Sequence, residues 1–394
     1  MQREKLLSYM IDCTEIAVCQ GTMTEKTADD ESFIKGYIGA IAEYLCYPYE
    51  IIAPRVKNVP VVFVCDKKTL TSCPEDIEKC TQEAILCYME EDCENAKKII
   101  PTYAVSPDLS DEKIDKWCES IRKKAEKTTV KINVLKKKTK NFQWVKFSYE
   151  GGYFYGKYRE KNSSYLLVSL PGYNSEWNDL AAYLGGDYDI IQLSPQGYNT
   201  PYGFNQKKRL RGTWPVLYDT VTKTDEDTGY NKWFFEAVLA TVKIRKPGQK
   251  LIFLGTSQGG GASLIMSSVF NDLAVACNSE MPFLIGLSDI NYKKICEFVL
   301  NQLNSPEIII YNFYAKERLH VIDPVKHRER LVCPVLLVSG ELDRDCTKED
   351  IFMLYELLGC KKKYVELKGQ GHGYSEKFKI LAKDWIDSVI ASDK

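Results

Sequence analysis

The sequence predicts an α/β fold built on a mostly parallel sheet, and two observations support this. From about residue 143, short β-rich apolar runs alternate with amphipathic helical stretches. The run Leu251-Ile252-Phe253-Leu254 is apolar throughout, as expected of a central strand that is buried on both faces. Because neighbouring parallel strands need crossover connections, we expect helices on both faces of the sheet.

The expected elements run in order from residue 143 to residue 390. Strands are expected at residues 143–149, 153–159, 165–170, 188–194, 250–256, 274–279, 334–341 and 363–368. Helices are expected at residues 230–244, 258–270, 292–303, 348–358 and 375–390. The first two strands meet at Glu150-Gly151-Gly152, which indicates a hairpin. The pattern predicts an eight-stranded sheet in a domain that spans residues 141–394.

The first 140 residues are expected to form an accessory domain, α+β or mainly helical, that carries no chemical motif. Helices are expected at residues 32–46, 74–91 and 110–127, and a strand at residues 59–65. Residues 121–140 hold nine basic residues and one acidic residue. We interpret this stretch as a solvated helix end followed by a basic linker; a patch that binds a polyanion or a partner is the alternative.

Composition excludes several classes of protein. The 53 basic and 54 acidic residues nearly cancel, so nucleic acid is not expected as a partner. No apolar run is long enough to span a membrane, and the N-terminal residues lack the continuous apolar stretch of a signal peptide. The 14 cysteines include no C-x-x-C pair, so we expect reduced thiols in a cytoplasmic protein, with no metal or other cofactor. A homo-oligomer is left open.

A nucleophile motif follows the apolar strand. Gly255-Thr256-Ser257-Gln258-Gly259 matches G-x-S-x-G and runs from the predicted strand directly into a predicted helix. In that context a sharp turn projects the serine hydroxyl above the sheet, and glycines flank the serine because side chains would collide with the turn and with the neighbouring strand. Ser257 is therefore the candidate nucleophile; the alternative is a tight turn with an idle serine.

Only three histidines can supply a base for this serine. His372 follows the last predicted strand on a glycine-rich loop, which can present the imidazole at the carboxyl edge of the sheet. His320 and His327 precede the strand near residue 334, and we interpret them as surface or buried structural residues. His372 is therefore the candidate general base.

The acid is expected between the serine and the histidine, because α/β-hydrolases use the chain order Ser, Asp or Glu, His. Asp343 stands at the end of the predicted strand 334–341, where its carboxylate can meet the far side of the imidazole. Glu341 and Asp345 are close rivals, and Asp343 is favoured over both. The sequence thus predicts a Ser-His-Asp triad on an α/β-hydrolase fold.

Two backbone N–H groups are expected to stabilise the oxyanion that forms during acyl transfer. One belongs to Gln258, the residue after the nucleophile. The other is assigned to Tyr173, in the loop after the predicted strand 165–170. In comparable enzymes such a donor is worth roughly 10²–10³ in rate.

Several segments are similar to one known family. They are Gly255-Thr256-Ser257-Gln258-Gly259-Gly260-Gly261, Pro171-Gly172-Tyr173, Pro282-Phe283-Leu284, Cys333-Pro334-Val335-Leu336 before Asp343, and Arg211-Gly212 before Tyr218-Asp219. With them, residues 143–392 resemble the acetylxylan esterase and cephalosporin-C deacetylase family of carbohydrate esterases. The resemblance implies an α/β-hydrolase fold and gives the oxyanion hole to Gln258 and Tyr173.

The chain departs from that family in two turns. The family's His-Gly-Tyr reads Pro171-Gly172-Tyr173 here, and its Asp-x-Arg-Gly-x-Gly reads Gln192-Leu193-Ser194-Pro195-Gln196-Gly197, without the arginine. Neither change touches the candidate triad. Both bear on substrate choice and on oligomer contacts.

These observations favour a serine carboxylesterase that works through an acyl-enzyme and deacetylates a sugar or a small-molecule ester. An acyltransferase, a thioesterase or a peptidase could use the same triad, and a binding protein with a vestigial site is a third hypothesis. Aromatic and basic residues follow the fourth strand: Tyr198, Tyr202, Phe204, Lys207, Lys208, Arg209, Arg211 and Trp214. They are expected either to line a pocket for a sugar or an anionic substrate or to pack as a loop on the N-terminal domain.

Overall fold

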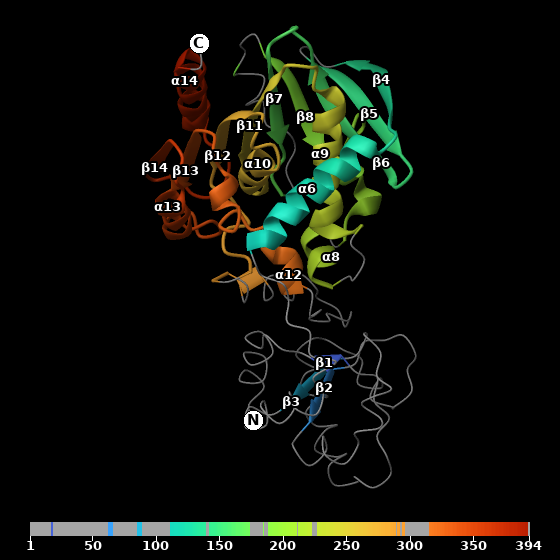
Figure 1. The fold of residues 1–394 in the computed structure, drawn as a ribbon, viewed down its shortest axis with the longest axis vertical. Coiled ribbons are helices and arrows are strands. Elements are labelled where there is room, and N and C mark those ends of the chain that lie inside the picture. The colour runs from blue at the N-terminus through green and yellow to red at the C-terminus, as the bar shows by residue number, and fades with distance from the viewer. Residues whose placement is uncertain are drawn as a thin grey trace. The chain divides into compact units, whose positions relative to one another are not determined.

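A computed structural model describes residues 111–138, 142–173, 184, 188–210, 212–222, 227–288, 290–291, 294–295 and 315–392, with three short strands before them. The chain divides into two units (Figure 1). One comprises Met1–Asp108 with Tyr292–Glu317, and the other comprises Leu109–Asn291 with Arg318–Lys394. Within the described residues, no helix is both long and apolar enough to cross a membrane.

In the larger unit, nine strands of the described chain form one sheet in the order β14-β13-β12-β11-β7-β8-β6-β5-β4. The strands are β4 (Lys131–Lys138), β5 (Gln143–Tyr149), β6 (Gly152–Arg159), β7 (Tyr165–Leu170), β8 (Asp189–Ser194), β11 (Lys250–Thr256), β12 (Ala274–Glu280), β13 (Val335–Gly340) and β14 (Lys362–Leu367). Strands β7, β8 and β11 to β14 pair in parallel, whereas β4, β5 and β6 pair antiparallel. The eight predicted strands are confirmed to within one residue at each end.

Strand β4 was not predicted, and it lies in the segment interpreted as a basic linker. Its apolar residues Ile132 and Val134 alternate with polar ones, but the surrounding lysines hide that period. Lysines are common on edge strands because they discourage pairing with a second chain. The linker interpretation is therefore wrong for residues 131–138, which form the outer strand beside β5.

Helix α6 (Asp111–Lys127) confirms the helix expected at residues 110–127 and also belongs to the larger unit. It buries Ile114, Cys118, Ile121 and Ala125. These residues recur at helical spacing and face α9 and α10. The structure thus groups α6 and β4 with the residues that follow them, because α6 packs against α9 and α10 and β4 pairs with β5.

The remaining helices and short elements of this unit connect its strands or follow the last one. The helices are α8 (Val216–Thr222), α9 (Gly229–Ile244), α10 (Gln258–Val269), α13 (Lys348–Leu357) and α14 (Glu376–Ser392), while α12 (Ala315–His320) straddles the division between the units. Short pieces are η3 (Pro195–Gly197), β9 (Asn199–Thr200), β10 (Gly203–Phe204), η4 (Gln206–Lys208) and η5 (Arg328–Arg330). In Figure 1, helices α6, α9 and α10 lie together over one face of the sheet.

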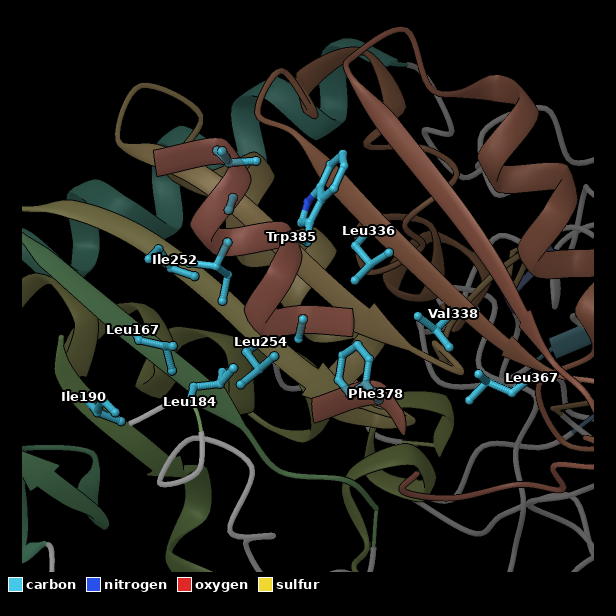
Figure 2. Close-up of a cluster of buried hydrophobic side chains, with 14 of the residues drawn as sticks. Leu167, Leu184, Ile190, Ile252, Leu254, Leu336, Val338, Leu367, Phe378 and Trp385 are labelled. Carbon is cyan, nitrogen blue, oxygen red and sulfur yellow. The ribbon is translucent and has the colours of Figure 1, made fainter. Parts of the chain in front are cut away.

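Side-chain alternation in β13 shows that both faces of the sheet are buried. Leu336 and Val338 pack with α14, whose Phe378 and Trp385 reach the sheet in Figure 2. Val335 and Leu337 pack on the opposite face with residues of α10 and α13. A strand covered on both sides must be apolar throughout, which is why β11 and β13 read as continuous apolar runs.

The smaller unit contributes three described strands, β1 (Ala17–Val18), β2 (Val62–Cys65) and β3 (Ile85–Tyr88), in the order β1-β3-β2. Strand β2 confirms part of the strand expected at residues 59–65. The helix expected at residues 74–91 is wrong over β3, because a short apolar run does not distinguish a buried helix from a strand. The helix expected at residues 32–46, and all of 292–303 except residues 294–295, lie outside the described residues.

Candidate active site

The candidate nucleophile sits in a strained turn between β11 and α10. Ser257 has φ +59° and ψ −122°, a backbone conformation that residues other than glycine rarely adopt. The turn is tight enough to require glycine on both sides: a Cβ on Gly255 would lie 2.2 Å from the Gly259 oxygen, and one on Gly259 would lie 2.2 Å from the Leu170 oxygen. The Ser257 N–H donates to the Glu280 oxygen at 2.9 Å, which fixes the turn to the end of β12.

The candidate base lies within hydrogen-bond distance of this serine. His372 Nε2 is 2.9 Å from Ser257 Oγ. The imidazole comes from the loop after β14, which is held by a hydrogen bond from the Leu342 N–H to the Gln370 oxygen at 2.8 Å. The hydrogen bond with Asp343 raises the pKa of His372 above its usual 6.5, against the opposing effect of burial. A raised pKa makes the imidazole a better proton acceptor.

The geometry separates the three acidic candidates. Asp343 Oδ2 is 2.8 Å from His372 Nδ1, and its other oxygen accepts the N–H groups of Asp345 and Cys346, both at 2.9 Å. Its side chain is fully buried, while that of His372 is 28% exposed. Glu341 instead binds the Gly369 N–H at 2.7 Å. Of the three carboxylates, Asp343 therefore holds the imidazole.

The two candidate oxyanion donors lie on neighbouring segments. Gln258 is the first residue of α10, and its side chain donates to the Pro171 oxygen at 3.3 Å, which ties α10 to the loop after β7. The Tyr230 hydroxyl donates to Gln258 Oε1 at 2.8 Å and holds that side chain in place. On the same loop, the Tyr173 hydroxyl donates to the Trp214 oxygen. The side chains of Gln258 and Tyr173 thus bond the loop after β7 to α10 and to the backbone at Trp214.

Tyr230 was not singled out in the sequence. It is fully buried on α9, beside Trp233 and Phe234, so it reads as one more aromatic core residue. Nothing in its local pattern tells that its hydroxyl meets Gln258, because the two residues come from different helices. The hydrogen bond is a tertiary feature.

The other two histidines lie buried, as expected for structural residues. His327 Nε2 donates to the Val321 oxygen at 2.9 Å, so Nδ1 of the neutral ring accepts from Ser268 Oγ at 2.7 Å. Burial lowers the pKa of His327 to about 4, so it is neutral at pH 7. His320 is 1% exposed.

The aromatic and basic residues after β8 pack mainly on one another. The ring of Tyr198 stacks on Trp214 with centroids 4.3 Å apart, and both are buried. Arg209 lies over Phe204 and Trp214 at 4.6 and 4.5 Å. Tyr202 is 87% exposed, and Arg211 lies outside the described residues. Most of this segment therefore forms a packed excursion rather than an open lining.

In the described part of the chain, one group of side chains is close enough to hold a metal. The ligand atoms of Asp343, Cys346 and His372 lie within 4.8 Å of one another. However, Asp343 Oδ2 and His372 Nδ1 already bind each other. A metal here would have to break the contact that orients the imidazole.

The sheet topology and the strand–turn–helix around Ser257 define an α/β-hydrolase fold. Two solved structures are similar to it: acetyl xylan esterase 1 from Thermoanaerobacterium sp. JW/SL YS485, with 18% identity and a TM-score of 0.53, and acetyl xylan esterase from Paenibacillus sp. R4, with 16% identity and a TM-score of 0.51. Each match covers 71% of this chain and 94% of the other. No family model and no curated protein matches the sequence. At these identities the likeness shows the fold alone, so the chemistry is argued from the site.

Proposed function

We propose that the protein is a serine carboxylesterase that removes a short acyl group, with acetyl the first choice, from a sugar or a small-molecule ester. One observation carries the proposal: Ser257, His372 and Asp343 form a continuous hydrogen-bonded chain with contacts of 2.9 and 2.8 Å. Nucleophile, base and orienting acid are thus already within reach of one another before substrate binds.

The reaction follows from these contacts. Ser257 Oγ attacks the ester carbonyl carbon while His372 Nε2 takes the hydroxyl proton, and the Asp343 carboxylate stabilises the resulting imidazolium. The N–H groups of Gln258 and Tyr173 receive the carbonyl oxygen as it becomes negative. Collapse of the tetrahedral intermediate expels the alcohol, which takes the proton from His372. Water then attacks the acyl-enzyme by the same steps and releases the carboxylic acid.

The choice of acetyl rests on resemblance. The motifs around Ser257, Pro171-Gly172-Tyr173 and Pro282-Phe283-Leu284 are similar to those of acetylxylan esterases, and both fold neighbours carry that activity in their names.

We also propose a cytoplasmic location. The cysteines described between residues 111 and 392, namely Cys118, Cys277, Cys333, Cys346 and Cys360, carry free thiols, which fits a reducing compartment.

The test is a panel of esters with acyl chains of increasing length, including 4-nitrophenyl acetate and a peracetylated sugar. We expect acetate release that Ser257→Ala abolishes and that Ser267→Ala, a matched loss of a buried hydroxyl on α10, leaves unchanged. A fluorophosphonate probe should label the wild type and not Ser257→Ala. Turnover no greater than that of Ser257→Ala across the panel would overturn the proposal. Acyl transfer to an added alcohol in place of acetate release would make the protein a transferase.

A further inference from the structure

Glu280, the last residue of β12, is a fully buried acid beside the candidate site. Its carboxyl accepts two hydrogen bonds. Thr256 Oγ1 donates to Oε2 at 2.7 Å, and the Ser375 N–H donates to Oε1 at 2.9 Å. The two partners come from segments about 120 residues apart, and each lies close in sequence to a residue of the candidate triad.

The positions of Thr256 and Ser375 in the chain show which parts of the candidate site Glu280 joins. Thr256 immediately precedes Ser257, and Ser375 lies three residues after His372. The Glu280 main-chain oxygen also accepts the Ser257 N–H at 2.9 Å. One residue of β12 is thus bonded both to the turn that carries the nucleophile and to the loop that carries the base.

The loop that carries His372 needs such an anchor. Between β14 and α14 it contains three glycines, of which Gly369 and Gly373 have φ of +69° and +119°. Glycine-rich backbone has many alternative conformations to lose on folding. Before His372, the loop is held by the bond from the Leu342 N–H to the Gln370 oxygen and by the bond from the Gly369 N–H to Glu341. After it, the Ser375 N–H donates to Glu280, and Ser375 also accepts the N–H groups of Lys377 and Phe378 at the start of α14.

Burying this carboxyl costs free energy, and no ion pair with another described residue offsets that cost. Burial raises its pKa to about 8, and the two hydrogen bonds oppose that rise only in part. An apolar residue at the end of a central strand would suit the core better. The cost is offset if the carboxyl supports the site.

We propose that Glu280 is a positioning residue that sets the distance between Ser257 and His372 by bonding to both segments. The inference rests on the proposed function. It predicts that loss of these bonds lowers kcat by about 10- to 100-fold while KM stays nearly constant, since a shift of about 1 Å at a reacting group can cost 10² in rate.

Two substitutions separate hydrogen bonding from filling of space. Glu280→Gln keeps an oxygen for the Ser375 N–H and places an amide donor against Thr256, so it should retain kcat within about two-fold. Glu280→Met keeps most of the volume and loses both bonds. The control is Asp189→Leu, which removes another buried carboxyl. Asp189 binds the Lys161 and Ser163 N–H groups at the amino-terminal end of β8, whereas Glu280 lies at the carboxyl-terminal end of β12.

Rates are expressed per active site, titrated by complete labelling with a fluorophosphonate. A purely structural role would lower melting temperature and the labelled fraction but not kcat per labelled site, which is the result expected for Asp189→Leu. The inference requires that Glu280→Met lose kcat per labelled site and that Glu280→Gln restore it. Equal kcat in Glu280→Met and the wild type would overturn it.

A second measurement does not depend on activity. Hydrogen–deuterium exchange of the segment after His372 should be faster in Glu280→Met than in Glu280→Gln, because the Ser375 N–H loses its acceptor. Unchanged exchange would refute the anchoring role even if the wild type hydrolysed no ester. A wild type that neither labels nor turns over, but shows faster exchange in Glu280→Met, would refute the proposed function and keep the anchor.

Discussion

Tyr230→Phe removes a single buried hydroxyl and should lower both the stability and the activity of this protein. In the folded chain that hydroxyl donates to Gln258 Oε1 at 2.8 Å, and Gln258 in turn donates to the Pro171 oxygen at 3.3 Å. The ring would stay packed against Trp233 and Phe234. The substitution therefore isolates the hydrogen bond that holds the first residue of α10.

The size of the effect follows from burial. Both partners are buried, so Gln258 Oε1 would lose its described donor and no water could easily replace it. Such a loss costs about 1–3 kcal/mol of unfolding free energy. The expected loss of kcat is about 10-fold, below the roughly 10²–10³ of removing an oxyanion donor outright, because the Gln258 N–H is loosened and not deleted.

The assay compares kcat for 4-nitrophenyl acetate and the urea midpoint in Tyr230→Phe and in Tyr149→Phe. Tyr149 is the matched control, since its hydroxyl likewise donates to a buried side chain, Glu236 Oε1, at 2.7 Å. We expect both variants to lose stability and only Tyr230→Phe to lose kcat. If Tyr230→Phe loses stability alone, the proposed link from α9 to the candidate oxyanion hole is refuted.

Three further predictions concern the candidate triad and the buried histidine. Asp343→Asn should lower kcat by about 10⁴ through the wrong imidazole tautomer, whereas Asp345→Asn should change it little; steady-state rates of both variants decide between the two acids. Because Asp343 raises the pKa of His372, kcat/KM should fall as pH drops through a value above 6.5, and a pH–rate profile with a lower midpoint would contradict this. Burial lowers the pKa of His327 from 6.5 to about 4, so the unfolded chain takes up the proton first. The free energy of unfolding should therefore decrease by up to about 3 kcal/mol as the pH falls from 6.5 towards 4. Urea unfolding at pH 7 and at pH 5 should show a smaller decrease in His327→Gln than in the wild type.

Local sequence patterns were sufficient to predict most of the long helices and strands of the larger unit. The eight predicted strands and helices α9, α10, α13 and α14 were readable because each buried element repeats apolar residues with its own period. Strand β4 escaped because its lysines hide that period, and β3 escaped because four apolar residues fit either a helix or a strand. Strand β3 owes its state to pairing with β1 and β2, which lie outside any short window, whereas β4 pairs with the next strand in the chain, β5.

The candidate site divides in the same way. The sequence alone determined Ser257 as candidate nucleophile and His372 as candidate base, because a strand–turn–helix is local and histidine is scarce. Only the tertiary structure decided that the Asp343 carboxylate binds the imidazole Nδ1, while Glu341 binds the Gly369 N–H. It also decided the contacts of Tyr230 and Glu280, since which way a side chain points across two packed elements depends on how those elements meet, and sequence spacing does not encode that.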